Sequence, residues 1–376
     1  MYYPKNKTEK VSELMTGWRR DLHMIPEVGF DVKKTCGYLR SVLNGMDCSM
    51  IPAAKNGLCA FFDFGRTSTV AYRSDMDALP ITEISGVPYA SRHPGFMHAC
   101  GHDGHMAALL GLAYVLDALG DAPSNVLLIF QPAEETTGGA KIICDSGILK
   151  KYQVDRVFGI HIWPGFEAGQ PAACPGSMMA GSCEVTAISR GESSHCAGTG
   201  ENKDAIRAIC DFLTRSYLLP GLKVSSPPAE EDCLLKFGKI YGGSVRNAIA
   251  GHAALEGTLR CLDEHNIEKM ISELRALAGP CGEKYGCTIE ISRSQGYLPV
   301  YNDPALYADI SSVLGEYGLV SCSPVMLTED FSFYQREAPG IFFFLGTGEN
   351  KALHSNRFDF DENILTDALE IYLRIL

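Results

Sequence analysis

The sequence predicts an α/β protein in which a larger domain is interrupted by a smaller α+β domain. Three observations support this fold class. The chain has 376 residues, which is more than one hydrophobic core usually holds. Apolar segments of strand length alternate with helical segments through the first half, as they do in a sheet covered by helices. After Pro175-Gly176 the expected order becomes strand, helix, strand, strand, helix, strand, which is the order of a ferredoxin-like domain.

The first half contains four strand candidates and two helix candidates. The strands are short and apolar, whereas the helices carry apolar residues at helical spacing and end at Gly120 and Gly147. The predicted strands are 57–64, 69–73, 125–130 and 154–162, and the predicted helices are 103–119 and 140–146. We expect the first two strands to be neighbours, joined by a turn at 65–68.

The interrupting domain is expected at about residues 179–295. Its predicted strands are 182–189, 234–241, 253–261 and 287–294, and its predicted helices are 204–216 and 266–278. From Tyr297 we expect the chain to return to the first domain, where an apolar strand at 339–345 and a closing helix at 364–376 follow. The larger, mixed α/β domain therefore combines residues 1–178 and 296–376.

Composition and charge exclude several classes of partner. The chain has 33 Lys and Arg against 45 Asp and Glu, a formal net charge of −12, and no basic block. Such a chain is a poor partner for nucleic acids and anionic membranes. The longest apolar runs, 126–130 and 341–345, are too short to span a bilayer. The charged N-terminus lacks the apolar segment of a secretory signal, so we expect a cytoplasmic protein.

The 14 cysteines are expected to be reduced thiols, as is usual in a large chain without a secretory signal. No Cys-x-x-Cys pair is present. Cys59, Cys144, Cys210 and Cys261 lie in apolar surroundings, so they are interpreted as small buried hydrophobic residues.

Metal-ligating residue types are concentrated in the segment 98–105, which reads HACGHDGH. It precedes and opens the predicted helix 103–119. A thiolate and an imidazole spaced like Cys100 and His102 can reach one ion from a loop. The alternative is that Asp103 caps the helix and the histidines are polar surface residues.

Ligand-type residues also occur near the ends of three apolar strands. Glu134 and Glu135 follow one predicted strand, His161 ends another, and His354 follows a third. The carboxyl ends of strands are where open α/β sheets carry their sites. Taken singly, the acids could be exposed loop residues and each histidine could be a hydrogen-bonded core residue.

A further pair, Asp75 and Asp77, follows the predicted strand 69–73. Carboxylates at such positions can orient ligand histidines, or the catalytic base, without binding the metal themselves.

The potential ligands are Cys100, His102, Glu135, His161 and His354. Five ligands exceed what one four-coordinate structural ion uses, and they suit two divalent ions that share a water, with the thiolate able to bridge them. A thiol, imidazole and carboxylate set accommodates Mn, Zn, Co or Ni. Glu134 would then act as the general base toward that water.

Several motifs together resemble the amidohydrolase branch of the aminoacylase-like metallopeptidases. They are WRRDLHMIPEVGF at 18–30, RSDMDALP at 73–80, HACGHDGH at 98–105, PAEE at 132–135, GIHIWP at 159–164, TEDFSFY at 328–334 and LHS at 353–355. This branch includes hippurate hydrolases, indole-acetyl-amino-acid hydrolases, N-acyl-amino-acid deacylases and N-acetyl-diaminopimelate deacetylases. The resemblance covers nearly the whole chain, and HACGHD followed by PAEE is highly specific.

The resemblance implies a catalytic domain with two metal ions and an inserted lid domain, which often forms a homodimer. The expected reaction is hydrolysis of the amide bond of an N-acyl amino acid. Cys100, His102, Glu135, His161 and His354 would hold the metals, with Glu134 as the base and Asp75 as a further catalytic-site residue. Relatives outside this branch carry His-x-Asp where Arg73-Ser74-Asp75 stands, so a ligand histidine is absent here and the Cys100/His102 pair compensates.

In the lid, ESSHCA at 192–197 stands where the family carries a Gly-Gly-His-Ala-Ala-like motif. His195 is retained and is expected to hydrogen-bond the developing oxyanion, or else to be a surface histidine. Asn247 is expected to help hold the substrate, and Arg246 could bind its carboxylate or remain solvated. Two other functions stay open, namely a dipeptidase or carboxypeptidase with the same metals and a non-catalytic metal-binding protein of this fold.

Overall fold

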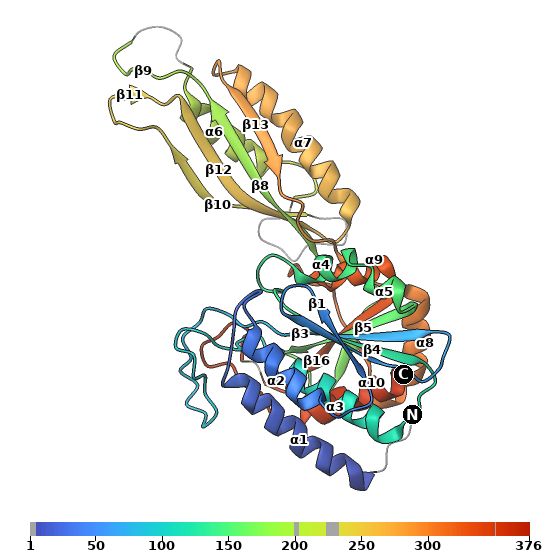
Figure 1. The fold of residues 1–376 in the computed structure, drawn as a ribbon. Coiled ribbons are helices and arrows are strands. Elements are labelled where there is room, and N and C mark those ends of the chain that lie inside the picture. The colour runs from blue at the N-terminus through green and yellow to red at the C-terminus, as the bar shows by residue number, and fades with distance from the viewer. Residues whose placement is uncertain (1–4, 199–202, 223–232, 350) are drawn as a thin grey trace. The chain divides into compact units, whose positions relative to one another are not determined.

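The computed structural model describes residues 5–198, 203–222, 233–349 and 351–376 (Figure 1). The chain divides into two units. The first comprises Met1–Gly176, Tyr301–Ser323 and Asp330–Leu376, and the second Ser177–Val300 and Pro324–Glu329. The expected inserted segment, 179–295, lies within the second unit, which also takes up the short segment 324–329 that the sequence did not indicate.

The first unit is built on an eight-stranded mixed sheet with the order β1-β2-β4-β3-β5-β16-β6-β15. These strands are β1 (Ser49–Ala53), β2 (Gly57–Phe62), β3 (Thr69–Asp75), β4 (Asn125–Gln131), β5 (Val154–Trp163), β6 (Pro171–Ala173), β15 (Val320–Ser321) and β16 (Gly340–Gly346). The four neighbours β4, β3, β5 and β16 run parallel. Because parallel strands end at the same edge, the residues that follow them are brought together.

The expected pairing of the first two predicted strands is wrong, because β4 lies between β2 and β3. β4 pairs antiparallel with β2 and parallel with β3. Its seven residues are all buried, so this strand belongs in the middle of the sheet. The side-chain oxygen of Asn125, the first residue of β4, accepts hydrogen bonds from the backbone N–H groups of Phe64 and Arg66. The segment between β2 and β3 therefore crosses the start of β4, and β2 and β3 do not form a hairpin.

Helices cover both faces of this sheet (Figure 1). One face carries α3 (His102–Leu119), α10 (Ile364–Ile375) and α8 (Pro304–Leu314), with α1 (Lys5–His23) and α2 (Lys33–Leu43) packed against α3. The other face carries α4 (Gly139–Asp145), α5 (Ile148–Lys151) and α9 (Tyr334–Glu337). α3 approaches β5 closely at Gly104, where a Cβ atom would lie 2.8 Å from Ile162 Cδ1. The predicted fold class is confirmed, although α1, α2 and α8 were not predicted.

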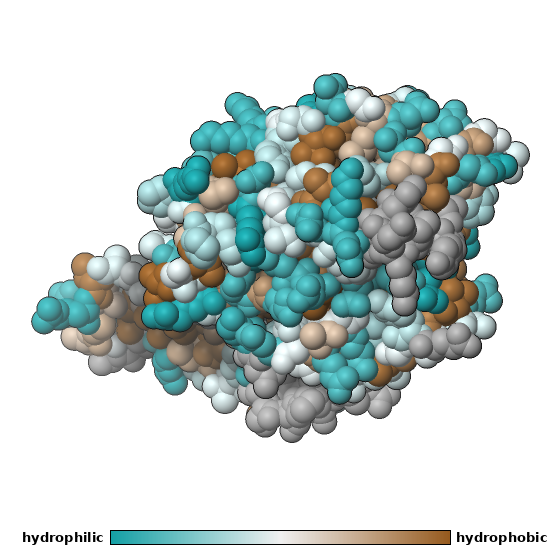
Figure 2. Space-filling model, turned by 90° about the horizontal axis from the view of Figure 1, so that it is seen from below, coloured by the Kyte–Doolittle hydropathy of each residue, from teal (hydrophilic) through white to brown (hydrophobic). Residues whose placement is uncertain are grey.

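The surface shown in Figure 2 is mainly hydrophilic, and its hydrophobic residues are scattered in small groups. Among the described residues, no helix combines the length and the apolar character that crossing a bilayer requires.

The second unit contains a four-stranded antiparallel sheet with the order β10-β12-β8-β13. Its strands are β8 (Gly181–Arg190), β10 (Cys233–Gly242), β12 (His252–Cys261) and β13 (Thr288–Arg293), and its helices are α6 (Ala205–Ser216) and α7 (Glu264–Glu283). Both helices pack on one face of the sheet around a core that includes Val185, Phe212 and Leu274. This is the predicted ferredoxin-like arrangement. Two short strands, β9 (Ser194–His195) and β11 (Ala248–Ile249), form a separate antiparallel pair.

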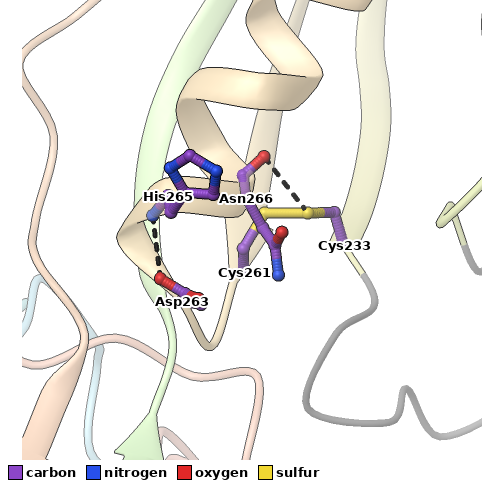
Figure 3. The surroundings of a disulfide bond; sticks show 5 residues. All are labelled: Cys233, Cys261, Asp263, His265 and Asn266. Carbon is purple, nitrogen blue, oxygen red and sulfur yellow. Dashed lines mark hydrogen bonds between the residues drawn. A yellow bond between two sulfur atoms is a disulfide. The ribbon is translucent and has the colours of Figure 1, made fainter.

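The prediction that all cysteines are free thiols is wrong for Cys233 and Cys261, which form a disulfide (Figure 3). The two residues lie opposite each other where β10 begins and β12 ends. The Cys233 Sγ atom also lies 3.7 Å from the backbone oxygen of Asn266 in α7. Cys59 and Cys144 are buried as expected, whereas Cys210 is exposed on α6. Sequence alone cannot reveal a pair that 28 residues separate and strand register brings together.

We expect Cys233→Ser to lower the free energy of unfolding of the second unit by about 3–4 kcal/mol, because the disulfide closes a loop across 28 residues of sequence. Urea unfolding followed by circular dichroism, with and without a phosphine reductant, measures this loss. Cys210→Ser is the matched control, since that thiol is free and exposed. Identical unfolding of wild-type protein with and without reductant would contradict the expectation.

Candidate metal centre

Five side chains from four segments meet at the carboxyl edge of the parallel strands. Cys100 Sγ lies 3.4 Å from His161 Nε2. Glu135 Oε1 lies 3.2 Å from His354 Nε2 and 3.9 Å from His102 Nε2. Potential ligand atoms of Cys100, Glu135 and His354 all lie within 4.8 Å of one another, and those of His102, Glu134 and Glu135 do as well. The residues predicted as metal ligands are thus neighbours in space.

The backbone near the candidate ligands adopts unusual conformations. Gly101 precedes α3 with φ +85°, a conformation that glycine adopts without strain. Ala133 and His354 both have φ +62°, in the left-handed region that non-glycine residues rarely adopt. The backbone N–H of His354 donates to the carbonyl oxygen of Ala99 at 2.8 Å. This hydrogen bond connects the loop that contains His354 to the segment that contains Cys100. Such strain is typical of functional sites, where the surrounding structure maintains it.

The hydrogen bonds of the histidines separate ligand candidates from supporting residues. His102 Nδ1 lies 2.8 Å from the carbonyl oxygen of Asp77, and His161 Nδ1 lies 2.7 Å from that of Ile162. Each Nδ1–H therefore donates to a carbonyl, and each Nε2 is left as a ligand atom. In His105 both nitrogens are used, because Nδ1 bonds Asp75 and Nε2 accepts the N–H of Ile162. His105 therefore supports the site and is not a candidate ligand.

Asp77 fixes the position of the two adjacent glutamates. Its carboxylate accepts the backbone N–H groups of Glu134 at 2.9 Å and Glu135 at 3.2 Å, and its carbonyl binds His102. Burial, followed by the charge of Glu135, raises the pKa of Asp77 well above its usual value. The sequence indicated an orienting role for Asp75 and Asp77, at the end of β3, but it favoured Asp75. Hydrogen bonds from Asp77 to a backbone 57 residues away leave no local signal.

Asp75 is held from behind by Arg73. The Arg73 guanidinium donates to Asp75 Oδ2 at 2.9 Å, to Asp330 Oδ1 at 3.0 Å and to Gln131 Oε1 at 2.8 Å. Burial raises the pKa of Asp75, but the charges of His102, His105 and Arg73 outweigh it and hold the pKa well below its usual value. Position 73 therefore supplies a buried cation to the base of the site.

The donor set fits divalent metal ions. His102 Nε2 is buried and has no hydrogen-bond partner among the described residues. Burial lowers the pKa of both His102 and His161, which favours the neutral imidazole that a metal requires. Burial, with the charges of Glu135 and Glu134, raises the pKa of the Cys100 thiol well above its usual value. Cations at this centre would offset the clustered negative charge and stabilise the thiolate.

His23 lies behind the ligand segment and forms a buried ion pair. Its Nδ1 lies 2.8 Å from Asp103 Oδ2, and its Nε2 lies 3.3 Å from Glu83 Oε1. Burial lowers the pKa of His23, but the charge and hydrogen bond of Asp103 and the hydrogen bond of Glu83 outweigh it and raise the pKa to about 9.

We expect His23→Gln to destabilise the protein by roughly 2–3 kcal/mol near pH 6 and to have little effect above about pH 10. Because the folded pKa of about 9 exceeds the usual 6.5, protonated His23 stabilises the fold fully below pH 6.5, and this contribution is lost as the pH rises through 9. Thermal unfolding from pH 5.5 to 10 measures the difference. His265→Gln, at an exposed position, is the control, and a difference that is constant across this range would contradict the assignment.

In the second unit, the β9–β11 pair brings two predicted substrate-binding residues together. His195 pairs with Ala248, and the N–H of Cys196 donates to the carbonyl oxygen of Asn247 at 3.1 Å. His195, Arg246 and Asn247 are all exposed. The pairing therefore places His195 and Asn247 side by side, although they are far apart in the sequence.

An α/β sheet with thiol, imidazole and carboxylate groups converging beyond its parallel strands defines a metallohydrolase-like centre. A family model described as peptidase family M20/M25/M40 matches residues 71–376. The chain belongs to this family, and it is a metal-dependent amidohydrolase.

Relatives and solved structures agree with this assignment. N-acetyldiaminopimelate deacetylases from Streptococcus uberis and from Listeria monocytogenes serotype 4a are 35% identical over 363 residues and 32% identical over 366 residues. The first alignment covers 93% of this chain and 95% of the relative, and the second covers 95% and 97%. The crystal structure of a dinuclear metal-binding peptidase of family M20 from Bacillus subtilis has a TM-score of 0.86 and 26% identity, with 98% of each chain covered.

Proposed function

We propose that this chain hydrolyses the amide bond of N-acyl amino acids and releases a carboxylic acid and an amino acid. The observation that carries the proposal is the position of Glu134. Its side chain is buried, and it lies beside potential metal-ligand atoms of His102 and Glu135. The names of the aligned relatives support an N-acetylated substrate, and N-acetyldiaminopimelate is the first candidate.

In this proposal two divalent ions would be held by Cys100, His102, Glu135, His161 and His354. Bound ions would polarise the scissile carbonyl and lower the pKa of the attacking water. The chain's own contribution is to fix these ligands, through the carbonyls that bind His102 and His161 and through Asp77 beneath Glu135.

Glu134 is the proposed general base. Its carboxylate takes a proton from the attacking water as the carbon–oxygen bond forms, and it returns that proton to the nitrogen as the carbon–nitrogen bond breaks. The Asp77 carboxylate accepts the backbone N–H of Glu134, which fixes the Glu134 backbone beside the candidate ligands. Asp75 keeps the buried imidazole of His105 in one orientation beneath the ligands.

Substrate binding is assigned to the second unit. His195 would donate to the developing oxyanion and Asn247 would hold the substrate. Arg246 is exposed and remains a candidate for the substrate carboxylate. Arg260 is a second candidate, because its half-buried guanidinium donates to the carbonyl of Met326 and pairs with no carboxylate in the described part of the chain. Burial accordingly lowers the pKa of Arg260.

The geometry of the second unit supports a homodimer in which His195 of one copy contributes to the substrate site of the other copy. β8 runs for ten residues, about 30 Å, from Gly181 to Arg190. The unit joins the rest of the chain next to Gly181, whereas His195 lies beyond the opposite end of the strand. Arg260 pairs with Ser182 near the first end, so Arg260 and His195 of one chain are too far apart to hold one small substrate. If Arg260 binds the substrate carboxylate, His195 must therefore serve the substrate of a second copy, and this is the assignment that we propose.

The β10 edge of the sheet is the proposed contact between copies. β10 lies at one end of the strand order, and Ile240 and Tyr241 on it are 54% and 43% exposed. An exposed apolar edge strand favours pairing with another strand.

Mixing two inactive variants tests the shared site. His195→Ala and Glu134→Gln should each be nearly inactive alone, whereas co-refolded mixtures should regain activity, because one site of each hybrid dimer has an intact Glu134 and an intact His195. If each chain instead uses its own His195, every site of the hybrid dimer lacks either Glu134 or His195, and the mixture stays inactive. A mixture that stays inactive, despite hybrid dimers seen by native mass spectrometry, would contradict this assignment.

A substrate panel tests the reaction itself. Purified protein loaded with Mn, Zn, Co or Ni should release amino acid from N-acetyl substrates, N-acetyldiaminopimelate among them, and from N-benzoyl substrates. Preferential cleavage of dipeptides would favour the dipeptidase alternative. Metal binding without turnover of any amide would favour a non-catalytic protein.

A further inference from the structure

Arg19, near the end of α1, is buried and makes four polar contacts with side chains from distant parts of the first unit. Its side chain is 1% exposed. Nε donates to Asp103 Oδ2 at 2.8 Å, and Nη2 donates to Asp359 Oδ1 at 2.7 Å. Nη1 donates to the hydroxyl of Tyr89 at 3.0 Å and to Glu362 Oε1 at 3.1 Å. One guanidinium therefore joins segments that lie up to 343 residues from it in sequence.

These contacts reach two of the segments that carry candidate metal ligands. Asp103 directly follows His102 in the first turn of α3. Asp359 lies five residues after His354, in the segment that leads to α10. Arginine can hold both at once because its planar fork presents five N–H groups in a fixed geometry.

The guanidinium is also immobilised and kept charged. Its carbon atom lies 4.4 Å from the centre of the Phe360 ring and 4.9 Å from that of Tyr89. Burial lowers the pKa of Arg19, but the charges of Asp103 and Asp359 outweigh it and raise the pKa above its usual value. A buried charge with three carboxylate partners and two aromatic neighbours has little freedom to move.

We propose that Arg19 is a positioning residue of the metal centre, which sets the spacing between the Cys100–His102 segment and the His354 loop. This inference rests on the proposed function, because the spacing matters only if both loops bind metal. Arg19 touches neither a candidate ligand atom nor the substrate, so it acts through Asp103 and Asp359. Groups that hydrogen-bond metal ligands directly typically contribute 10- to 100-fold to metal affinity, and Arg19, one contact further out, should lie at the lower end of this range.

The test compares Arg19→Gln with Arg20→Gln. Arg20 is the matched control because it lies next in the same helix and also binds Glu362, but its side chain is 46% exposed and does not contact Asp103 or Asp359. Manganese affinity of the full-length protein is measured by competition with a chromophoric chelator. We expect Arg19→Gln to bind manganese about tenfold more weakly, with lower kcat and little change in KM. Arg20→Gln should bind as the wild type does.

Further variants separate positioning from charge and from general stability. Arg19→Lys keeps the charge but loses the fork, so we expect it to bind manganese as weakly as Arg19→Gln, and full rescue would overturn the inference. Unchanged manganese affinity in Arg19→Gln, even with a lower melting temperature, would also overturn it. If Arg19→Gln fails to fold, Asp359→Ala removes the carboxylate that Arg19 binds on the His354 side. This variant should weaken manganese binding about threefold or more, and no change would overturn the inference. Wild-type protein that binds no divalent ion would instead overturn the proposed function.

Discussion

Glu134→Gln is expected to lower kcat about 10²- to 10⁴-fold while metal affinity changes little. The amide keeps the size of the carboxylate, and the backbone N–H that Asp77 holds is unaffected. Gln cannot accept a proton from water, so the step that Glu134 would perform is lost. Steady-state kinetics on the preferred N-acyl amino acid, together with elemental analysis of the purified variant, measure both quantities.

Two variants control this experiment. Glu13→Gln, at an exposed position of α1, should leave kcat unchanged. Glu135→Gln should instead lose metal, because its carboxylate lies against both His102 and His354. Near-normal turnover by metal-loaded Glu134→Gln would remove the assignment of the base, and loss of metal from it would show that Glu134 is a ligand.

The elements that the sequence predicted best are those whose character is set locally. α3 is apolar on nearly every side and is closed by Gly120 in a left-handed conformation, and both features are visible in the sequence. α1 was missed, because its few apolar residues are separated by charges and the helix packs through residues such as Val11 and Met15 on one side only. The order of the strands was also missed in part, since the position of β4 between β2 and β3 depends on partners that no local pattern specifies.

The same distinction applies to the candidate site. The side chains with metal-binding chemistry could be picked out because Cys, His and Glu are uncommon just beyond buried strands. The residues that hold them could not be ranked, because Asp77, Arg73 and Arg19 act through contacts across 57 to 343 residues. A buried arginine has no sequence pattern that distinguishes it from an exposed one. Arg19 and Arg20 are adjacent, yet one is buried and the other is half exposed.

Removing the metal should abolish hydrolysis, by about 10³-fold or more, and also destabilise the first unit. Without cations, Glu134, Glu135, Asp75 and Asp77 crowd one buried region, where burial, followed by the charges of Glu135 and Asp75, raises the pKa of Asp77. A ligand that binds only the folded state at 100 times its Kd adds about 2.7 kcal/mol of stability, so the metal-free protein should melt several degrees lower.

Dialysis against a chelator, with the metal content then verified, provides the metal-free protein, and activity and thermal unfolding are measured before and after each divalent ion is added back. Cys100→Ser gives an independent check, because it replaces the thiol that lies 3.4 Å from His161 and should lower both the metal content and the melting temperature. Full activity or an unchanged melting temperature after verified removal would contradict the centre. If added metal restores the melting temperature but not the activity, metal binding is intact and catalysis is not. The defect would then lie in Glu134 or in the residues of the second unit, and not in the metal ligands.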